Sequence, residues 1–216
     1  MNIDANDLKF KHPFTLICAG PTGSGKTILI AKILEHHKIM FDPIPDKIIY
    51  CYSLWQESFL KMLESNPNIE FVEGMIPSVQ IDSLKKNLII LDDLMEENKD
   101  NEDLQNIFTK GSHHRNISLI FISQNLFIQG KKTRTISLNT HYMIIFKNPR
   151  DKAQFSQLAR QMLPGKTQFL NECFMDATSH AHGYLFLDFK QQTPENLRVR
   201  TNIIPGEKFI VYIFKK

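Results

Sequence analysis

Short apolar runs rich in β-branched and aromatic residues alternate along the chain with segments whose apolar residues recur at helical spacing. The runs are nearly continuous and do not alternate with polar residues, which is typical of strands covered by helices on both faces. They comprise residues 14–19, 47–52, 88–91, 118–123 and 142–146. The alternation predicts βαβ units and therefore an α/β fold with a mostly parallel sheet flanked by helices.

The helical segments fall between these runs, and Asp or Asn lies near several of their starts. They comprise residues 27–37, 56–64, 103–113 and 151–162, with a further helix at 167–176. After it the pattern changes to three strands, GYLFLDF, NLRVRTNI and KFIVYIF, joined by the turn signals TPEN and PG. We expect these strands to form a C-terminal antiparallel addition to the sheet, and we expect the acidic residues 96–103 to form an exposed loop.

Composition narrows the class of protein. The chain has 216 residues, 42% of them hydrophobic and 23% charged, which is typical of globular proteins and favours one domain over residues 1–216. The net charge of +3 is too small to establish an anionic partner by itself. Three separated cysteines, Cys18, Cys51 and Cys173, fit a reducing compartment. Since no apolar run approaches about 20 residues and the first residues lack a signal-peptide core, we expect an intracellular protein without a membrane segment.

A glycine-rich segment follows the strand predicted at residues 14–19 and fits G-x-x-x-x-G-K-[ST] at every fixed position. It consists of Gly20, Pro21, Thr22, Gly23, Ser24, Gly25, Lys26 and Thr27. Glycines let successive N–H groups and the start of the next helix face an anion. In this pattern Lys26 neutralises the β- and γ-phosphates and the Thr27 hydroxyl ligates Mg²⁺. The segment therefore predicts a site for ATP and Mg²⁺, because a turn that only caps a helix leaves the lysine without a role.

Another apolar run ends in the carboxylates of Asp92 and Asp93. Open α/β sheets gather their ligands at the carboxyl ends of the strands, and adjacent side chains of a strand point to opposite faces. We therefore expect Asp92 to hold Mg²⁺ through its water shell and Asp93 to orient and deprotonate the attacking water. Acidic residues also start loops and cap helices, so this assignment depends on the preceding phosphate-binding loop.

A third run ends in the amides Gln124 and Asn125, shortly after Arg115. Gln124 either hydrogen-bonds the γ-phosphate or satisfies backbone groups at the strand end. Arg115 is either an arginine finger or a surface arginine at a helix end. Because fingers are often supplied by a neighbouring subunit, the first interpretation implies an oligomer.

Two further basic segments have a functional and an ordinary interpretation. Lys131, Lys132 and Arg134 lie beside a glycine in QGKKTR, where they either contact DNA phosphates or form a solvated loop. Arg150, in NPRD, is a second finger candidate that ranks below Arg115, because its segment also fits a turn and a helix start.

Other chemically suggestive residues lead to no assignment. Zinc is not predicted, because paired zinc-ligand spacing is missing at residues 36–37, at 113–114 and in the group Cys173, His180 and His182. Trp55, with Tyr50 and Tyr52, either stacks an adenine or packs in the core, so adenine recognition is not assigned.

The succession GPTGSGKT, LIILDD, SHHRN, SLIFISQN and FKNPRD resembles the genome-packaging ATPases of the FtsK/HerA superfamily, especially those of poxvirus-like viruses and Maverick/Polinton elements. The resemblance covers about residues 13–205, and the Gln-ended strand with an arginine before it is its selective part. It implies a RecA-like P-loop core with an additional strand between the P-loop strand and the Asp-Asp strand. It also implies a ring motor in which Gln124 faces the γ-phosphate and Arg115 acts in trans. Many relatives carry Glu where this chain has Asp93, which gives the base a shorter reach here.

Together the motifs and the resemblance predict an ATP-hydrolysing, DNA-translocating enzyme that acts as a homo-oligomeric ring. Its catalytic residues are expected to be Lys26, Asp93, Gln124 and Arg115. We expect it to package double-stranded DNA of a viral or virus-like genome in the host cytoplasm or nucleus, at sites of virion assembly, with a capsid or portal protein as a possible further partner. Two alternatives stay open: a nucleotide-gated assembly protein that does not hydrolyse, and another P-loop NTPase such as a nucleotide kinase.

Overall fold

The structure is a computed structural model that describes residues 4–77, 80–94, 116–126, 139–151, 153–162 and 164–214. In these residues one sheet has nine strands, in the order β11-β10-β9-β8-β2-β7-β6-β4-β5. The strands are β2 (Thr15–Ala19), β4 (Lys47–Tyr52), β5 (Ile69–Glu73), β6 (Asn87–Asp92), β7 (Ile117–Ser123), β8 (Tyr142–Phe146), β9 (Tyr184–Asp188), β10 (Val199–Thr201) and β11 (Ile210–Val211). A separate two-stranded sheet pairs β1 (Phe10–Lys11) with β3 (Phe41–Asp42).

The strands from β8 to β5 are parallel, whereas β9, β10 and β11 are each antiparallel to their neighbour. This arrangement confirms the predicted parallel sheet with a C-terminal antiparallel addition. Strand β7 lies between β2 and β6, which confirms the additional strand between the P-loop strand and the Asp-Asp strand. The addition is shorter than predicted, because a 3-10 turn, η4 (Glu195–Leu197), precedes β10 and because β11 has only two residues.

The sequence pattern did not predict strand β5, which forms the edge of the sheet beside β4. Its sequence IEFVE is polar at two of five positions, and its side chains are only partly buried. An edge strand is covered less completely than a central one, so it lacks the continuous apolar run by which the other parallel strands were recognised.

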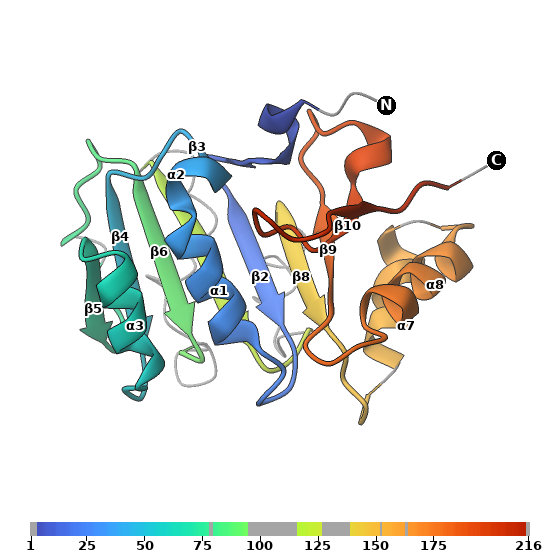
Figure 1. Cartoon of the computed structure of the whole chain (residues 1–216), viewed down its shortest axis with the longest axis horizontal. Helices are drawn as coiled ribbons and strands as arrows, with labels where there is room; N and C mark the ends of the chain where they lie inside the picture. The colour runs from blue at the N-terminus through green and yellow to red at the C-terminus, as the bar shows by residue number, and fades with distance from the viewer. Residues whose placement is uncertain are drawn as a thin grey trace.

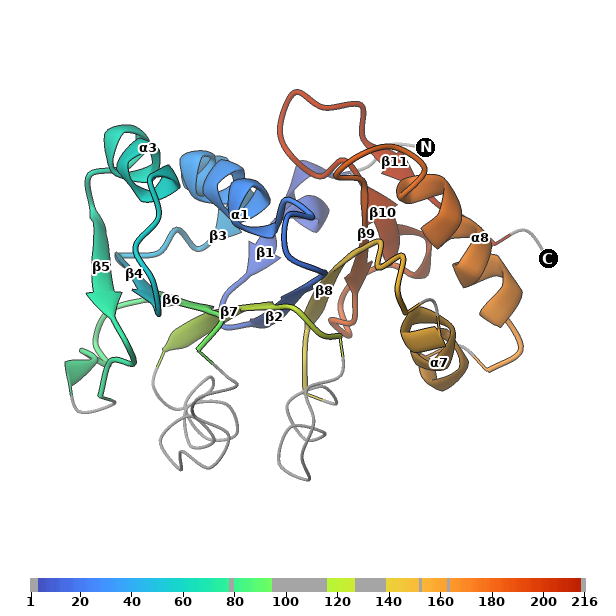
Figure 2. The same cartoon turned by 90° about the horizontal axis from the view of Figure 1, so that it is seen from below.

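Helices cover both faces of the sheet (Figures 1 and 2). They are α1 (Lys26–Glu35), α2 (His37–Met40), α3 (Ser58–Ser65), α7 (Ala153–Met162) and α8 (Thr167–Ala177), and a 3-10 turn η1 (Ala5–Leu8) precedes β1. α1 and α3 lie over one face, while α7 and α8 lie on the other side near β8 and β9. The predicted helices at 27–37, 56–64, 151–162 and 167–176 are confirmed. The helix predicted at 103–113 and the acidic loop at 96–103 lie outside the described residues.

Alternate residues of β2 show how the core is divided between the two faces. Leu16 and Cys18 pack in a cluster with residues of α1 and α3, such as Ile30. Ile17 packs in a second cluster with residues of α7 and α8, such as Leu158. Burial on both faces explains why the central strands have nearly continuous apolar sequences.

A buried ion pair ties the first two strands of the antiparallel addition together. The Arg200 guanidinium of β10 donates to Oδ2 of Asp188 of β9 at 2.7 Å, and both side chains are 2% exposed. Arg200 also lies over the ring of Phe186, 4.6 Å from its centroid. Loss of either charge would leave the other buried without its partner, so the pair keeps β9 and β10 in one arrangement.

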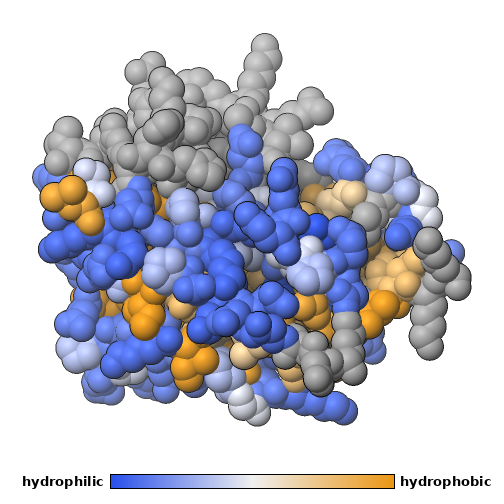
Figure 3. Space-filling model, turned by 90° about the horizontal axis from the view of Figure 1, so that it is seen from above, coloured by the Kyte–Doolittle hydropathy of each residue, from blue (hydrophilic) through white to orange (hydrophobic). Residues whose placement is uncertain are grey.

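On the face drawn in Figure 3, the described residues are mostly hydrophilic, and hydrophobic residues occur as separate patches among them. Scattered hydrophobic residues are ordinary on a protein surface. Among the described helices, none combines the length and the apolar character that crossing a membrane requires.

Candidate active site

The phosphate-binding loop, residues 20–27, leaves the carboxyl end of β2 and enters α1 at the lower edge of the sheet in Figure 1. The Gly20 N–H donates to the Ser123 carbonyl of β7 at 3.1 Å. A Cβ at Gly20 would lie 2.6 Å from Cβ of Phe146, so only glycine fits between these strands. Gly23 and Gly25 have positive φ angles of 77° and 105°, which other residues adopt at a cost. The glycines are therefore required by the backbone path of the loop.

Lys26 is buried at the start of α1 and turns back into the loop. Its ammonium donates to the carbonyl oxygens of Gly20 at 2.7 Å and of Pro21 at 3.1 Å. These charge-assisted bonds hold the loop curled around the lysine before any ligand binds. The positive charge thus lies inside the curve, where an anion would meet it.

A pocket of about 360 Å³ beside α1 brings together Lys26, Thr27, Asp92 and Asp93. Asp92 is 5% exposed, and its Oδ2 accepts a hydrogen bond from the Tyr50 hydroxyl at 2.8 Å. Burial raises the pKa of Asp92 to about 6, because loss of hydration outweighs the stabilising Tyr50 hydrogen bond. A cation would offset this buried charge.

Thr27 and Asp92 fit the requirements of Mg²⁺, because a hydroxyl and a carboxylate are the hard oxygen ligands that this ion prefers. The structure therefore brings together the two residues predicted to ligate it. Among the described residues, no group of three or more His, Cys, Asp or Glu side chains could hold a metal ion.

Asp93 and Gln124 lie together at the ends of β6 and β7. Nε2 of Gln124 donates to Oδ2 of Asp93 at 3.3 Å. The backbone of Asp93 has a φ of 54°, which turns the chain at the end of β6, and its N–H donates to the Ile122 carbonyl. Asp and Asn adopt this conformation more easily than most residues. The turn accounts for the different directions of the two adjacent carboxylates.

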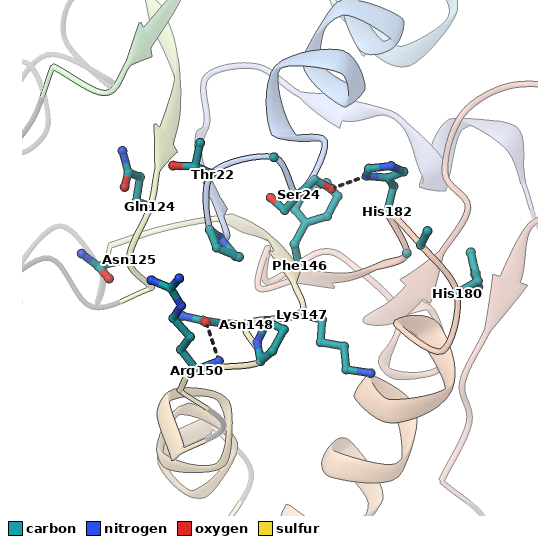
Figure 4. A pocket seen from close by; sticks show the side chains of 15 residues that line it. Thr22, Ser24, Gln124, Asn125, Phe146, Lys147, Asn148, Arg150, His180 and His182 are labelled. Atoms are coloured by element: carbon teal, nitrogen blue, oxygen red, sulfur yellow. Dashed lines mark hydrogen bonds between the residues drawn. The ribbon is translucent and has the colours of Figure 1, made fainter.

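A larger pocket, of about 680 Å³, lies between the first half of the phosphate-binding loop and residues 146–150. Thr22, Gln124, Asn125 and Arg150 line it, and Figure 4 shows the Arg150 guanidinium on the side that the two amides occupy. The Asn148 side chain stabilises the turn before α7, because its Oδ1 accepts a hydrogen bond from the backbone N–H of Arg150 at 3.1 Å. Arg150 thus lies beside the phosphate-binding loop of its own chain. Four of the residues predicted to contact ATP or DNA lie outside the described residues: Arg115, Lys131, Lys132 and Arg134.

His182 contacts the phosphate-binding loop from the segment between α8 and β9 (Figure 4). Its Nδ1–H donates to the Ser24 carbonyl at 3.0 Å, and a Cβ at Gly25 would lie 3.2 Å from the same nitrogen. Sequence reasoning considered His182 only as a metal ligand. The contact joins residues 158 positions apart, so no local pattern could have revealed it.

The aromatic residues considered for adenine stacking take other positions. Tyr50 is fully buried, and its hydroxyl orients Asp92. The centroid of its ring lies 5.0 Å from that of the Phe59 ring. Trp55 is half exposed and packs edge-on against the rings of Tyr52 and Phe59. Core packing is therefore the correct interpretation for Tyr50.

The raised pKa of Asp92 makes stability depend on pH. In the native state the Asp92 carboxyl is protonated below about pH 6. In the unfolded chain it is protonated only below its ordinary pKa of 3.8. The native state therefore binds more protons in this window, and the free energy of unfolding falls as pH rises through it. In metal-free and nucleotide-free buffer, Asp92→Asn should raise that free energy at pH 7 by up to about 3 kcal/mol.

Urea unfolding at pH 7 and below pH 4 measures this effect. The gain should disappear at the lower pH, where Asp92 is protonated in both states. Tyr50→Phe serves as the matched variant, because it removes the hydroxyl that stabilises the carboxylate and should lower stability at pH 7. A gain from Asp92→Asn that is equal at both pH values would contradict the assignment to a buried charge.

In sequence the chain is similar to one described family, and in fold it is similar to solved structures. A model of the family described as "Poxvirus A32 protein" matches residues 2–162, which is more than half of the chain. No curated protein sequence matches. The solved structure of the genome packaging NTPase B204 from Sulfolobus turreted icosahedral virus 2, in complex with ATP-gammaS, is 14% identical, with a TM-score of 0.55 over 87% of this chain and 96% of that one.

A second solved structure matches a smaller part of this chain. The cytoplasmic domain of the Type VII secretion ATPase EccC from Thermomonospora curvata is 17% identical, with a TM-score of 0.45 over 60% of this chain and 20% of that one. At such identities a likeness concerns the fold alone, and the B204 match agrees with a P-loop NTPase fold.

Proposed function

Because the chain belongs to the family of the poxvirus A32 protein, we propose that it is a viral genome-packaging ATPase that hydrolyses Mg-ATP and moves double-stranded DNA. The observation that carries the proposal is the convergence of three strand ends on one edge of the sheet. Lys26 and Thr27 follow β2, Asp92 and Asp93 end β6, and Gln124 follows β7. A phosphate cradle, a metal ligand and a candidate base thus lie within one site.

Each residue has a separate role in the proposed hydrolysis. Lys26 neutralises the phosphates as charge develops on them, and Thr27 and Asp92 would hold Mg²⁺, which would supply further positive charge to the phosphates. The Asp93 carboxylate orients a water and accepts its proton as the water oxygen attacks phosphorus. Gln124 positions Asp93 through their hydrogen bond and addresses the γ-phosphate from the end of β7.

The proposed motor is a homo-oligomeric ring in which Arg115 of one subunit completes the site of the next. Arg150 lies beside its own subunit's loop and is therefore the candidate for a contact within one chain. The proposal also includes the whole chain acting as one domain, a capsid or portal partner, and action at intracellular sites of virion assembly.

The central experiment measures phosphate release from ATP with and without double-stranded DNA, together with the particle mass in ATP. We expect an oligomer whose phosphate release requires no acceptor and rises when DNA is added. Release that needs a nucleotide acceptor would identify a kinase instead. A monomer whose turnover does not respond to DNA would exclude the motor.

The basic segment at residues 129–134 provides a test of DNA contact. The triple variant Lys131→Ala, Lys132→Ala and Arg134→Ala should weaken DNA binding and DNA-stimulated hydrolysis, while ATP affinity stays unchanged. Since each phosphate contact contributes about 0.9 to the slope of log affinity against log salt, the slope should become shallower by about 3.

A second triple variant controls for the loss of charge alone. Lys38, Lys61 and Lys85 are exposed, and their replacement by Ala removes the same charge at other places. This control should bind DNA with nearly the original slope. If both triple variants weakened DNA binding equally, the weakening would come from the total charge and not from a DNA contact at residues 129–134.

A further inference from the structure

The phosphate-binding loop accounts for the triphosphate of a nucleotide but leaves its nucleoside half without a position. A pocket of about 470 Å³ adjoins the 360 Å³ pocket that contains Lys26, Thr27 and Asp92. The two pockets share Gly25, Ile28 and His182 as lining residues. A ligand can therefore extend from the phosphate pocket into its neighbour past these three residues.

The positions of the catalytic candidates give the triphosphate a direction. Asp93 is the residue of the 360 Å³ pocket on the γ-phosphate side, whereas Gly25, Ile28 and His182 line the part that this pocket shares with the 470 Å³ pocket. The nucleoside of a bound nucleotide therefore extends toward Ile28 and His182. The larger, 680 Å³ pocket is lined by Gln124 and Arg150, and it shares Phe146 and residues 180–183 with the 470 Å³ pocket.

Two side chains at the shared boundary offer surfaces on which a flat ring can pack. Ile28 is 60% exposed although it lies in the first turn of α1, immediately after the phosphate-binding loop. The His182 ring is held in place by its hydrogen bond to Ser24. Apolar and aromatic surfaces of this kind, with a few polar groups at one end, are typical of small-molecule sites.

Polar groups from the antiparallel addition line the other end of the pocket. Glu207 and Asn202 both line it, and the Glu207 carboxylate is 3.3 Å from the Lys32 ammonium. The Asn202 amide nitrogen donates to the Lys208 carbonyl at 3.0 Å, and an amide oxygen is a hydrogen-bond acceptor. These oxygens suit the hydroxyl and amino groups that a nucleoside carries.

We infer that the pocket between α1, His182 and residues 202–208 is the nucleoside subsite, and that a purine ring packs between Ile28 and His182 with its polar edge toward Asn202 and Glu207. This inference rests on the proposed ATPase function and extends it to base recognition. It assigns a ligand contact to the C-terminal antiparallel addition.

Two variants separate base contact from phosphate contact. Ile28→Ala removes the apolar surface and keeps a strong helix former in α1. His182→Asn removes the ring, keeps a side-chain N–H for Ser24 and suits the positive φ of 61° at this position. Ile39→Ala is the matched control, because Ile39 is 58% exposed on α2 and lines neither pocket.

Calorimetry with Mg²⁺ measures the affinity of each protein for ATP and for inorganic tripolyphosphate, which has no nucleoside. We expect both site variants to bind ATP about 10-fold more weakly, with tripolyphosphate affinity within about twofold of the original and no change in the control. Equal weakening of both ligands, or unchanged ATP affinity in both variants, would overturn the subsite. Failure of the unmodified protein to bind either ligand would instead overturn the nucleotide site, and this inference with it.

Discussion

Lys26→Met should weaken ATP binding by about 100-fold or more and should abolish measurable hydrolysis. The ammonium of Lys26 donates to the carbonyl oxygens of Gly20 and Pro21 and supplies the positive charge inside the loop. In the proposed ATP complex the ammonium would donate to β- and γ-phosphate oxygens. Hydrogen bonds to charged groups contribute about 1.5–3 kcal/mol each, so loss of two such phosphate contacts reaches a 100-fold effect. Methionine keeps the volume of the lysine stem, which limits the disturbance of the buried side chain. Calorimetry gives the ATP affinity and phosphate release gives the turnover.

Two controls separate loss of the charge at this position from general effects. Lys38→Met removes an exposed lysine on α2, and it should leave both affinity and turnover unchanged. Thermal unfolding without nucleotide establishes whether Lys26→Met is folded at the assay temperature. A folded Lys26→Met protein with the original ATP affinity would contradict the assignment of the loop.

Asp93→Asn should lower the turnover by about 10² to 10⁴-fold while ATP affinity changes little. The amide cannot accept the proton of the attacking water, so the chemical step loses its base. The backbone should keep its conformation, because Asn tolerates the positive φ of 54° at this position. Its amide oxygen can still accept the hydrogen bond from Gln124. Single-turnover hydrolysis and nucleotide affinity measured on the same preparation test both parts of this prediction.

Asp93→Glu is the informative companion variant. It restores a carboxylate and lengthens its reach, so hydrolysis should be measurable and well above that of Asp93→Asn. This pair also separates the enzyme from a nucleotide-gated assembly protein, whose assembly should not depend on a base at position 93. Equal turnover of the unmodified protein and Asp93→Asn would exclude Asp93 as the base.

Much of the fold was predictable because its signals are local. Continuous apolar runs identified five of the parallel strands, since burial on both faces selects the same residue types at every position. Strand β5 has no continuous apolar run and was not predicted, because it lies at the sheet edge and carries acidic residues. The position of β7 between β2 and β6 was implied only by the resemblance to packaging ATPases, because strand order cannot be read from periodicity.

The sequence by itself determined the phosphate-binding loop and the carboxylates after β6, because each lies in one short segment whose residue order sets the backbone path. The tertiary structure alone decided which distant side chains meet. It placed Tyr50 on Asp92, Gln124 on Asp93, and His182 on Ser24. These contacts depend on strand order and on the packing of the antiparallel addition against α1, and no local pattern encodes a distance between segments so far apart along the chain.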